Sequence, residues 1–504
     1  MYMNKNVLFF IGLLPANFCA KELQKPNVVF VYADDMGRGM LSHYGQKYIT
    51  TPNIDRLFAE GTAFENAYGC MFSAPARASM FTGYSDYRNN KWHIEKGALF
   101  KTDKIEEVID SVETAINARD VKLLGNDYIL PQVFKKAGYV TGEIGKLEWG
   151  FTVSRQQMKE HGWDYYYGYL DHVRCHGYYP PFLFENGNIV KIEGNTHVDC
   201  AKAFEKETPE TYKKRWNMDG KAVYSQNLFI EKAVQFIRDN KDKPFFLYHP
   251  TQLPHGPVAI PSVHPEVKDN PNLSELEKEY ASMVKMLDDH VGILLNELER
   301  QNLLDNTIFI FSVDNGHETY YTVDNRCMKA PARDINGKKF DDWNYPYTSE
   351  RAGDLFNGNS GLTGKKWSNW DGGVKVPLVF RWTNKVKAGS QSNQLVSNYD
   401  LVSTFADLLD VEINSDKDGI SYLPVLLGQK EKLPLRYVVL DSKVGPAVVS
   451  SDGWKLVYNK KKKESHLYYL PDDKLEQNNI YGKYPDVEKR LFAQINNIEV
   501  SNKK

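Results

Sequence analysis

Short apolar runs of strand length alternate with amphipathic helical patterns along most of this chain, and this alternation constrains its fold more than any other feature. Residues 27–32 and 307–313 are rich in β-branched and aromatic side chains, as buried strands are. Between them, residues 273–298 carry apolar side chains at steps of three and four, which places one apolar stripe on a long helix. This order predicts a mostly parallel α/β sheet covered by helices on both faces.

Other segments continue the same pattern through a large first domain. We predict further helices at residues 52–60, 130–137 and 225–240, and further strands at 139–144, 244–248 and 376–382. The stretch from 317 to 366 is rich in Asp, Asn, Gly and Tyr, and we expect a loop region that lines a site. We assign residues 21–430 to this large α/β domain.

The last part of the chain has a different character. Residues 436–440, 447–458 and 466–470 have the pattern of antiparallel strands around turns at Asp452-Gly453 and at 459–463, and residues 485–500 predict a closing helix. We therefore predict a smaller α+β subdomain at 431–504, docked on the large one.

The first twenty residues have the form of an export signal. One lysine precedes a short apolar run at residues 7–14, and small residues follow it up to Ala20. The run is too short to cross a bilayer, so we expect a signal peptide at 1–20, no transmembrane segment, and a periplasmic or cell-surface protein of a bacterium. Cys19 leaves a lipid anchor open as an alternative.

The cysteines and the net charge exclude few functions. After signal removal Cys70, Cys175, Cys200 and Cys327 remain, and they allow three disulfide connectivities without requiring any. The formal net charge of the 504-residue chain is −2, so it has no global basic field, which argues against a nucleic-acid-binding protein.

Acidic and amide side chains follow two of the predicted strands. Asp34 and Asp35 end the first strand, and Asp314 and Asn315 end the strand at 307–313. In open α/β sheets ligands bind at the carboxyl ends of the strands, and oxygen ligands of this kind suit calcium or magnesium. Each pair alone is more typical of a polar turn at a strand end, but both pairs in one sheet favour a shared metal site.

Ser73, Pro75 and Arg77 begin a segment that can turn helical. Because proline is pre-organised for the first positions of a helix, Ser73 would lie at a helix start, where free amides favour an anion. Arg77, one turn later, could reach the same point. Taken alone, this pattern is also that of an ordinary helix start.

Three basic residues are candidates for binding an anion beside the metal. Lys146 and His255 follow predicted strands, and Lys366 precedes the Asp371-Gly372-Gly373 turn. Each could be an ordinary surface residue, but a cluster of cations facing a metal would bind an ester oxyanion through charge-assisted hydrogen bonds.

Taken in order, these motifs resemble those of the type I sulfatases of the alkaline phosphatase superfamily, over nearly the whole mature chain. The matching segments are residues 26–35, 51–57, Ser73-x-Pro75-x-Arg77 with Thr82-Gly83, Gly145-Lys146, 244–248 with Pro254-His255, 311–316 and 371–377. The resemblance implies an alkaline-phosphatase-like α/β fold and the hydrolysis of sulfate esters.

The resemblance also implies a role for each residue. Ser73 occupies the position at which the family oxidises cysteine or serine to formylglycine, whose hydrate attacks sulfur and later expels sulfate. A serine there implies an anaerobic sulfatase-maturing enzyme as partner. The implied ligands of a calcium ion, with magnesium as second choice, are Asp34, Asp35, Asp314 and Asn315. The implied catalytic residues, besides Ser73, are Arg77, Lys146, His255 and Lys366. Lys365 adjoins Lys366, and only the spacing to Asp371 favours Lys366.

One position departs from the family pattern. The family often has a histidine two residues after the first lysine, and this chain has Glu148 there. Either Glu148 binds a sugar hydroxyl, or a histidine from elsewhere substitutes, for which His172 and His317 are candidates.

A segment rich in aromatic and polar side chains, residues 163–179, suits a sulfated sugar. We predict sugar contacts from Asp171, His172 and Arg174, with local packing of the aromatic rings as the alternative. The predicted function is sulfate removal from a glycan, on a galactose or N-acetylgalactosamine type of sugar. The alternatives are a phosphonate or phosphate monoester hydrolase of the same superfamily and a catalytically silent sulfated-glycan-binding relative.

Overall fold

The computed structural model describes residues 25–88, 104–118, 128–150, 155–172, 174–197, 207–321, 334–338, 343–414 and 416–503. The predicted signal peptide, Cys19, Cys200, Cys327 and the side chain of Arg174 lie outside this described part, so the predictions on them stay predictions. Cys70 and Cys175, the two cysteines within it, are buried and form no disulfide there.

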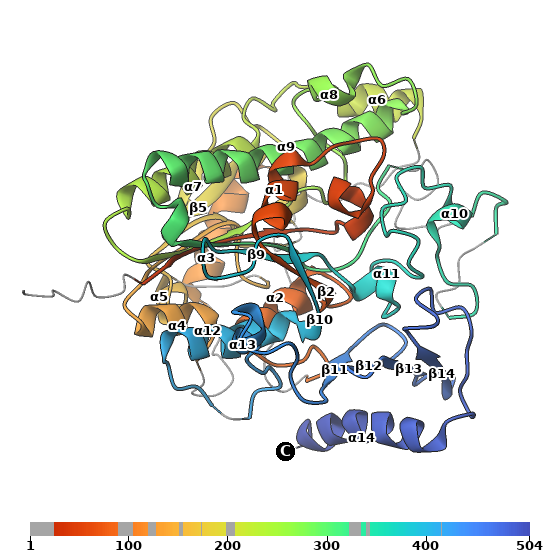
Figure 1. Ribbon diagram of the computed structural model, residues 1–504. Helices are drawn as coiled ribbons and strands as arrows, with labels where there is room; N and C mark the ends of the chain where they lie inside the picture. The colour runs from red at the N-terminus through yellow and green to blue at the C-terminus, as the bar shows by residue number, and fades with distance from the viewer. Residues whose placement is uncertain are drawn as a thin grey trace, which may run out of the picture.

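A ten-stranded mixed sheet forms the centre of the molecule (Figure 1). In spatial order its strands are β10 (Ser390–Ser397), β2 (Thr62–Tyr68), β9 (Leu378–Arg381), β8 (Thr307–Val313), β1 (Asn27–Ala33), β7 (Phe245–Pro250), β3 (Val140–Lys146), β4 (Tyr165–Tyr169), β5 (Phe182–Glu185) and β6 (Asn188–Lys191). β8, β1, β7, β3 and β4 are parallel to one another, and so are β10 and β2, whereas β9 is antiparallel to both of its neighbours, and β5 and β6 form an antiparallel edge beside β4.

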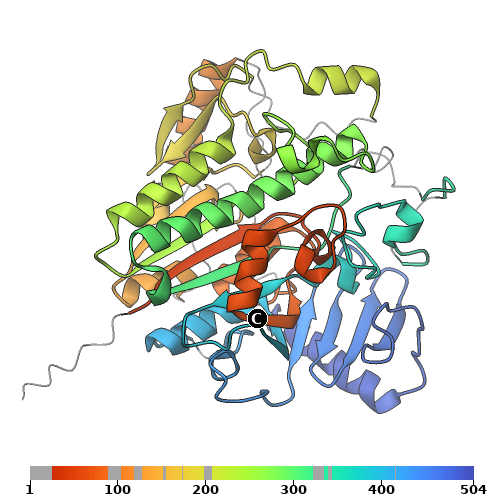
Figure 2. The ribbon, with the colours of Figure 1, turned by 45° about the horizontal axis from the view of Figure 1, so that its top comes forward.

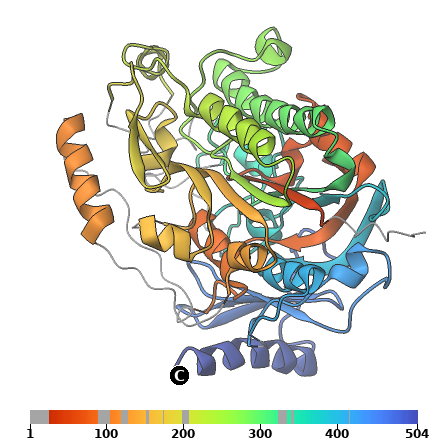
Figure 3. The same cartoon turned by 90° about the vertical axis from the view of Figure 1, so that its left-hand side faces the viewer.

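Helices cover both faces of this sheet, as the alternation of segments predicts. α1, α7 and α9 lie on one face, and α2, α4 and α12 pack together on the other (Figures 1 and 3). The α-helices are α1 (Pro52–Glu60), α2 (Ser73–Thr82), α3 (Ile105–Ala118), α4 (Leu130–Lys136), α5 (Arg155–Glu160), α6 (Pro209–Arg215), α7 (Ser225–Asp239), α8 (Pro265–Lys268), α9 (Glu275–Arg300), α10 (Ser349–Ala352), α11 (Asp371–Val374), α12 (Leu401–Leu409), α13 (Leu423–Leu426) and α14 (Pro485–Ser501).

The long helix α9 shows how local sequence sets this arrangement. Its N-cap Ser274 exchanges hydrogen bonds with Glu277 in a capping box, and its apolar stripe is buried. From the same helix, the carboxylate of Asp288 accepts hydrogen bonds from the backbone amides of Asn53 and Ile54, at 3.3 and 2.8 Å. Because these are free amides of the first turn of α1, α9 both covers the sheet and fixes α1 beside it.

The C-terminal residues form a separate four-stranded antiparallel sheet, β11 (Tyr437–Leu440), β12 (Ala447–Ser450), β13 (Trp454–Asn459) and β14 (Glu464–Tyr469), with α14 packed on it (Figure 2). The predicted strand at 447–458 is two strands, β12 and β13, joined at the predicted turn Asp452-Gly453. The predicted fold class, a large mostly parallel α/β sheet with a small C-terminal α+β part, is confirmed.

A buried ionic cluster joins the two sheets. The ammonium of Lys455 in β13 lies 2.6 Å from Asp371 Oδ1 and 2.7 Å from Glu476 Oε1, and the hydroxyl of Tyr68 also contacts Asp371. Burial of such charges is costly unless they are paired, so this cluster fixes the small sheet against the segment that follows Lys366. Among the described residues, no helix is both long and apolar enough to span a membrane.

Candidate active site

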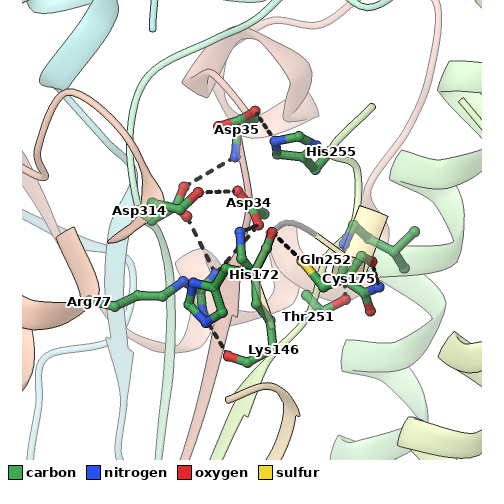
Figure 4. A network of polar contacts seen from close by, with 12 residues as sticks. Asp34, Asp35, Arg77, Lys146, His172, Cys175, Thr251, Gln252, His255 and Asp314 are labelled. Atoms are coloured by element: carbon green, nitrogen blue, oxygen red, sulfur yellow. Dashed lines mark hydrogen bonds and ion pairs between the residues drawn. The ribbon is translucent and has the colours of Figure 1, made fainter. Parts of the chain in front are cut away.

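The candidate site lies at the carboxyl ends of the four adjacent strands β8, β1, β7 and β3 (Figure 4). Asp34 and Asp35 directly follow β1, Asp314 and Asn315 directly follow β8, Lys146 ends β3, and His255 lies in the loop after β7. Gly145 has φ +136°, and a Cβ there would lie 2.2 Å from the carbonyl oxygen of Pro250. Only glycine fits this close approach, which sets the direction of Lys146.

Four buried oxygen-bearing side chains form the acidic part of the site. Asp34, Asp35, Asp314 and Asn315 are all 0% exposed. Asp314 Oδ1 accepts a hydrogen bond from the backbone amide of Asp35 at 3.1 Å, and Asn315 Nδ2 donates to Asp35 Oδ1 at 2.8 Å. Burial and then the charge of Asp34 raise the pKa of Asp314 to about 7. Such crowded carboxylates need a compensating cation.

These residues fit a hard divalent cation. Asn315 Oδ1 is buried and has no hydrogen-bond partner in the described part of the chain, so it is a free acceptor beside three carboxylates. Carboxylate and amide oxygens are preferred by calcium and magnesium. One oxygen each from Asp34 and Asp35 and one ring nitrogen of His255 lie within 4.8 Å of one another. This close group of three possible ligands contains His255, whereas the ligand set predicted from the sequence contains Asp314 and Asn315 beside the two aspartates.

Two buried lysines pair with these carboxylates. Lys146 Nζ lies 2.6 Å from Asp34 Oδ2, and Lys366 Nζ lies 2.6 Å from Asp35 Oδ2. Burial raises the pKa of Asp34, but Lys146, His255 and Arg77 outweigh it and hold the pKa well below its usual value. For Asp35, burial is outweighed by His255 and Lys366, and the pKa falls to about 2. Both carboxylates are therefore ionised at neutral pH.

Ser73 is the first residue of the buried helix α2. Its Oγ donates a hydrogen bond to Asp34 Oδ1 at 2.6 Å. One turn later, the guanidinium of Arg77 lies 3.4 Å from Asp314 Oδ2 and 3.6 Å from Asp34 Oδ2, and it is 0% exposed. The predicted helix start is therefore part of the site, with the hydroxyl directed at the carboxylates and the arginine beneath them.

His255 lies on the opposite side of Asp35. Its Nε2 is 3.0 Å from Asp35 Oδ2 and 3.2 Å from both Lys366 Nζ and the hydroxyl of Tyr320. The Tyr320 hydroxyl also donates to Asp35 Oδ2. The ring of His176 stacks on the ring of His255, with centroids 3.9 Å apart and an interplanar angle of 27°. The imidazole is thus fixed by contacts from three separate segments.

The profile of the sulfatase family matches residues 26–411, more than half of the chain. The chain belongs to the sulfatase family. It is therefore a sulfuric ester hydrolase. A profile described as N-sulphoglucosamine sulphohydrolase, C-terminal, matches residues 358–501.

Full-length relatives agree with this assignment. An N-acetylgalactosamine-6-O-sulfatase of Bacteroides thetaiotaomicron is 26% identical, over 98% of this chain and 99% of that protein. The N-acetylgalactosamine-6-sulfatase of Homo sapiens is 28% identical, over 82% of this chain and 68% of that protein. A solved structure from glycosaminoglycan metabolism in Bacteroides thetaiotaomicron has a TM-score of 0.70 at 24% identity, over 95% of this chain and 100% of that chain, and this likeness shows the fold alone.

Glu148 of this sulfatase is turned away from the cluster of acids and cations. It is 0% exposed with φ +51°, and its Oε1 lies 2.6 Å from His161 Nδ1 and accepts from Trp163 Nε1 at 3.0 Å. Its backbone amide donates to Glu143. The carboxylate serves these internal partners, so the geometry gives no support to the predicted contact with a sugar hydroxyl.

The two candidate substitute histidines differ in their placement. His172 Nε2 lies 2.7 Å from the carbonyl oxygen of Leu147, next to Lys146 (Figure 4). Burial and then the charges of Lys146 and Arg77 hold the pKa of His172 well below its usual value, so its ring is neutral. Both ring nitrogens of His317 have internal partners, the backbone amide of Gly37 at 3.2 Å and the Tyr321 hydroxyl at 2.7 Å. The placement favours His172.

The aromatic segment at 163–179 is mostly internal. Six of its rings are buried, those of Trp163, Tyr166, Tyr167, Tyr169, Tyr178 and Tyr179. Tyr178 donates to the carbonyl oxygens of Gln252 and His255, at 3.0 and 2.7 Å, so the segment supports the loop that carries His255. Asp171 in the same segment is 3% exposed. The alternative of local packing therefore describes these rings, and they offer no open stacking surface.

The sequence patterns missed Tyr320 and His176. Both are distant from His255 in sequence and carry no motif of their own. The spacing argument for Lys366 agrees with the geometry, because Lys365 pairs instead with Glu318 at 2.7 Å.

Proposed function

We propose that this sulfatase removes the sulfate ester from a galactose or N-acetylgalactosamine type of sugar in a glycan, with Ser73, converted to formylglycine, as the source of the nucleophile. The observation that carries this proposal is the 2.6 Å contact between Ser73 Oγ and Asp34, at the start of α2 and beside Arg77. The N-acetylgalactosamine-6-sulfatases among the relatives support the choice of sugar.

Ser73 is the only serine, among the described residues, that contacts Asp34. Once oxidised, its hydrated aldehyde supplies an oxygen nucleophile and a second hydroxyl that allows the sulfate to leave. Asp34 accepts the hydrogen bond from this position and orients it. Arg77, fixed between Asp34 and Asp314, balances the charge there. The maturation partner proposed for a serine precursor is an anaerobic sulfatase-maturing enzyme.

Asp34, Asp35, Asp314 and Asn315 would hold the metal ion, and calcium suits their oxygen donors better than magnesium because calcium tolerates more ligands in a less regular geometry. When bound, the ion supplies Lewis-acid polarisation of a sulfate oxygen. The site also offers His255 near Asp34 and Asp35, but an imidazole is a poorer ligand for such an ion. We therefore assign His255 to proton transfer rather than to metal binding.

Lys146, Lys366 and His255 then have complementary tasks. The two ammonium groups, each 2.6 Å from an aspartate, bind sulfate oxygens by charge-assisted hydrogen bonds when the substrate is present. His255, within 3.2 Å of Lys366 Nζ, donates a proton to the sugar oxygen that leaves. His172, beside Lys146, takes the place of the histidine that the family often has where this chain has Glu148.

The signal-like first twenty residues support an exported, periplasmic or cell-surface location.

The experiment begins with the mass of the peptide that contains Ser73, from protein co-produced with an anaerobic maturase. Conversion to the aldehyde makes the peptide roughly 2 Da lighter. Sulfate release is then measured on a panel of 6-, 4- and 3-sulfated galactose and N-acetylgalactosamine sugars, with phosphate and phosphonate esters alongside. Ser73→Ala should abolish release, and Ser79→Ala, which changes a buried serine of the same helix, should retain it.

Three results would overturn parts of the proposal. An unmodified Ser73, with a maturase that is active on a control protein, removes the nucleophile and favours a silent glycan-binding relative. Faster cleavage of phosphonate esters than of every sulfate ester favours the phosphonate hydrolase. Sulfate release only from sugars of another type corrects the substrate class and leaves the chemistry standing.

A further inference from the structure

Two aromatic residues directly adjoin the catalytic candidates in the sequence and lie against each other in space. Phe72 precedes Ser73, and Trp367 follows Lys366. Their rings stack with centroids 4.3 Å apart and an interplanar angle of 30°. Both side chains are partly exposed, unlike the buried rings of the 163–179 segment. We call this pair, Phe72 and Trp367, the aromatic platform.

The platform is held at the site by the backbone. Trp367 has φ +79°, a conformation that a large side chain adopts only when its surroundings impose it. Its amide donates a hydrogen bond to the carbonyl oxygen of Met71 at 2.8 Å, which ties the segment after Lys366 to the segment before Ser73. The ammonium of Lys366 lies 5.8 Å from the centre of the Trp367 ring. The platform therefore directly adjoins Lys366, one of the two lysines proposed to bind sulfate.

A positive charge from the small C-terminal sheet extends the platform. Lys443, in the loop between β11 and β12, is exposed, and its Nζ lies 4.0 Å from the centre of the Trp367 ring. A cation–π contact at an exposed site is weak, so a ligand that stacks on the ring can displace this long side chain without large cost. The displaced ammonium stays within reach of an anionic group on that ligand.

We propose that the aromatic platform stacks on a pyranose ring of the substrate glycan and that Lys443 pairs with a sulfate or carboxylate group of the same glycan. The apolar faces of a sugar ring pack on aromatic rings while its hydroxyls remain available for hydrogen bonds. A ring beside an exposed cation, at the rim of an anion site, is suited to a polyanionic glycan rather than a neutral one. This inference rests on the proposed function, since it names residues that select the substrate of that site.

The test is direct binding, which does not require turnover. Unmatured protein with intact Ser73, in calcium-containing buffer, is titrated calorimetrically with N-acetylgalactosamine 6-sulfate and with a disaccharide that carries this sugar at its non-reducing end. The main variant is Trp367→Gly, because glycine accepts the positive φ and keeps the backbone hydrogen bond from its amide to the carbonyl oxygen of Met71. Trp454→Ala, which removes a partly exposed tryptophan of β13 that packs at a tilt against Tyr469 and Tyr484, is the matched control.

We expect Trp367→Gly to weaken binding about five- to tenfold, with Trp454→Ala unchanged. A loss with both ligands places the sulfated sugar on the platform, and a loss with the disaccharide alone places the neighbouring sugar there. Unchanged dissociation constants for both ligands would overturn the inference. So would a wild-type protein that binds neither of them.

The charge is tested separately. Lys443→Ala should weaken binding of the polyanionic disaccharide at low salt and reduce its salt dependence, whereas Lys460→Ala, another exposed lysine whose Nζ lies 4.9 Å from an aromatic ring, should not. Equal salt dependence of binding in both variants would exclude the role of Lys443.

Failure of this inference and failure of the proposed function are distinguishable. If glycan binding depends on Trp367 but the matured protein releases no sulfate, the proposed function is refuted and this inference stands. If the matured protein releases sulfate and Trp367→Gly leaves kcat/KM unchanged, the proposed function stands and this inference is refuted.

Discussion

The Lys146 ammonium lies 2.6 Å from Oδ2 of Asp34, and the two side chains are 2% and 0% exposed. An ammonium ion and a metal ion would therefore draw on the same buried carboxylate. The ion pair lets Lys146 neutralise Asp34 in the absence of a metal. Under the proposed function, in which Lys146 binds a sulfate oxygen, this contact would link metal affinity to sulfate binding.

Lys146→Met should change the two properties in opposite directions. Removing the ammonium leaves the negative charge of Asp34 unpaired, so we expect calcium to bind about tenfold more tightly. Because a hydrogen-bond donor to sulfate is also lost, we expect kcat/KM for the sulfated sugar to fall at least about a hundredfold. Calcium binding is measured by calorimetry and turnover by sulfate release. Lys365→Met, which removes the neighbouring pair to Glu318, should leave both nearly unchanged. Weaker calcium binding in Lys146→Met would contradict this view of the contact.

Calcium should stabilise the folded protein through Asn315. A ligand that binds only the native state adds about 2.7 kcal/mol at a hundred times its dissociation constant, so Tm should rise with added calcium and fall after chelation. Asn315→Ala removes the free buried oxygen and should reduce the rise in Tm. Asn369→Ala is the matched control, because its Oδ1 is likewise buried without a hydrogen-bond partner in the described part and its Nδ2 donates to Gly445 instead. The same calcium response in both variants would exclude Asn315 as a ligand.

Local patterns predicted five of the ten strands of the large sheet, β1, β3, β7, β8 and β9, together with the residues at their ends, but not β2, β4, β5, β6 and β10. β1 and β8 were predictable because a buried parallel strand is a continuous apolar run, and Asp34 and Asp314 follow where such runs stop. Pro52 and the apolar spacing that follows it predicted α1 to the residue. These features depend on neighbours within one turn or one strand, which a single sequence contains.

Contacts that cross the chain were not predictable in this way. The stack of His176 on His255 joins residues far apart in sequence, and neither ring has a periodic neighbourhood. The positive φ of Glu148, which turns its carboxylate toward His161, is set by packing rather than by residue type. Whether an aromatic ring is buried or exposed is also a tertiary property, so the 163–179 rings and Trp367 could not be told apart from composition.

Tyr320→Phe should lower turnover without unfolding the protein. The Tyr320 hydroxyl contacts Asp35 Oδ2 and lies 3.2 Å from His255 Nε2, so its loss leaves both groups less restrained. We expect kcat to fall about tenfold, in line with one hydrogen bond to a charged group, and calcium affinity to change by a smaller factor. The measurements are kcat, KM and the calcium dissociation constant.

Tyr321→Phe provides the neighbouring control. Its hydroxyl contacts Asp354 at 2.6 Å and His317 rather than Asp35. We expect this variant to lose some thermal stability and to keep its kcat within about twofold of wild type. If the two variants have the same kinetic profile, Tyr320 acts only through general packing.

Asp86 should make the protein less stable as pH rises. Its carboxyl group is 6% exposed and accepts a hydrogen bond from the amide of Asp441 at 2.9 Å, and burial followed by the charge of Asp441 raises its pKa to about 8. The unfolded chain releases this proton near pH 4, about the usual value for aspartate. Between these pH values the folded state holds one more proton than the unfolded state. The free energy of unfolding therefore falls by about 1.4 kcal/mol per pH unit from this group.

Asp86→Asn keeps the acceptor for Asp441 and removes the titration. We expect the variant's Tm to decline less than that of wild type between pH 5 and pH 8, with the largest difference at pH 8, when both are melted by calorimetry in calcium-containing buffer. Asp110→Asn, on the exposed side of α3, should follow the wild-type curve. Parallel curves for Asp86→Asn and wild type would mean that Asp86 is ionised in the folded protein, and its burial would then have to be balanced by a cation that the described contacts do not include.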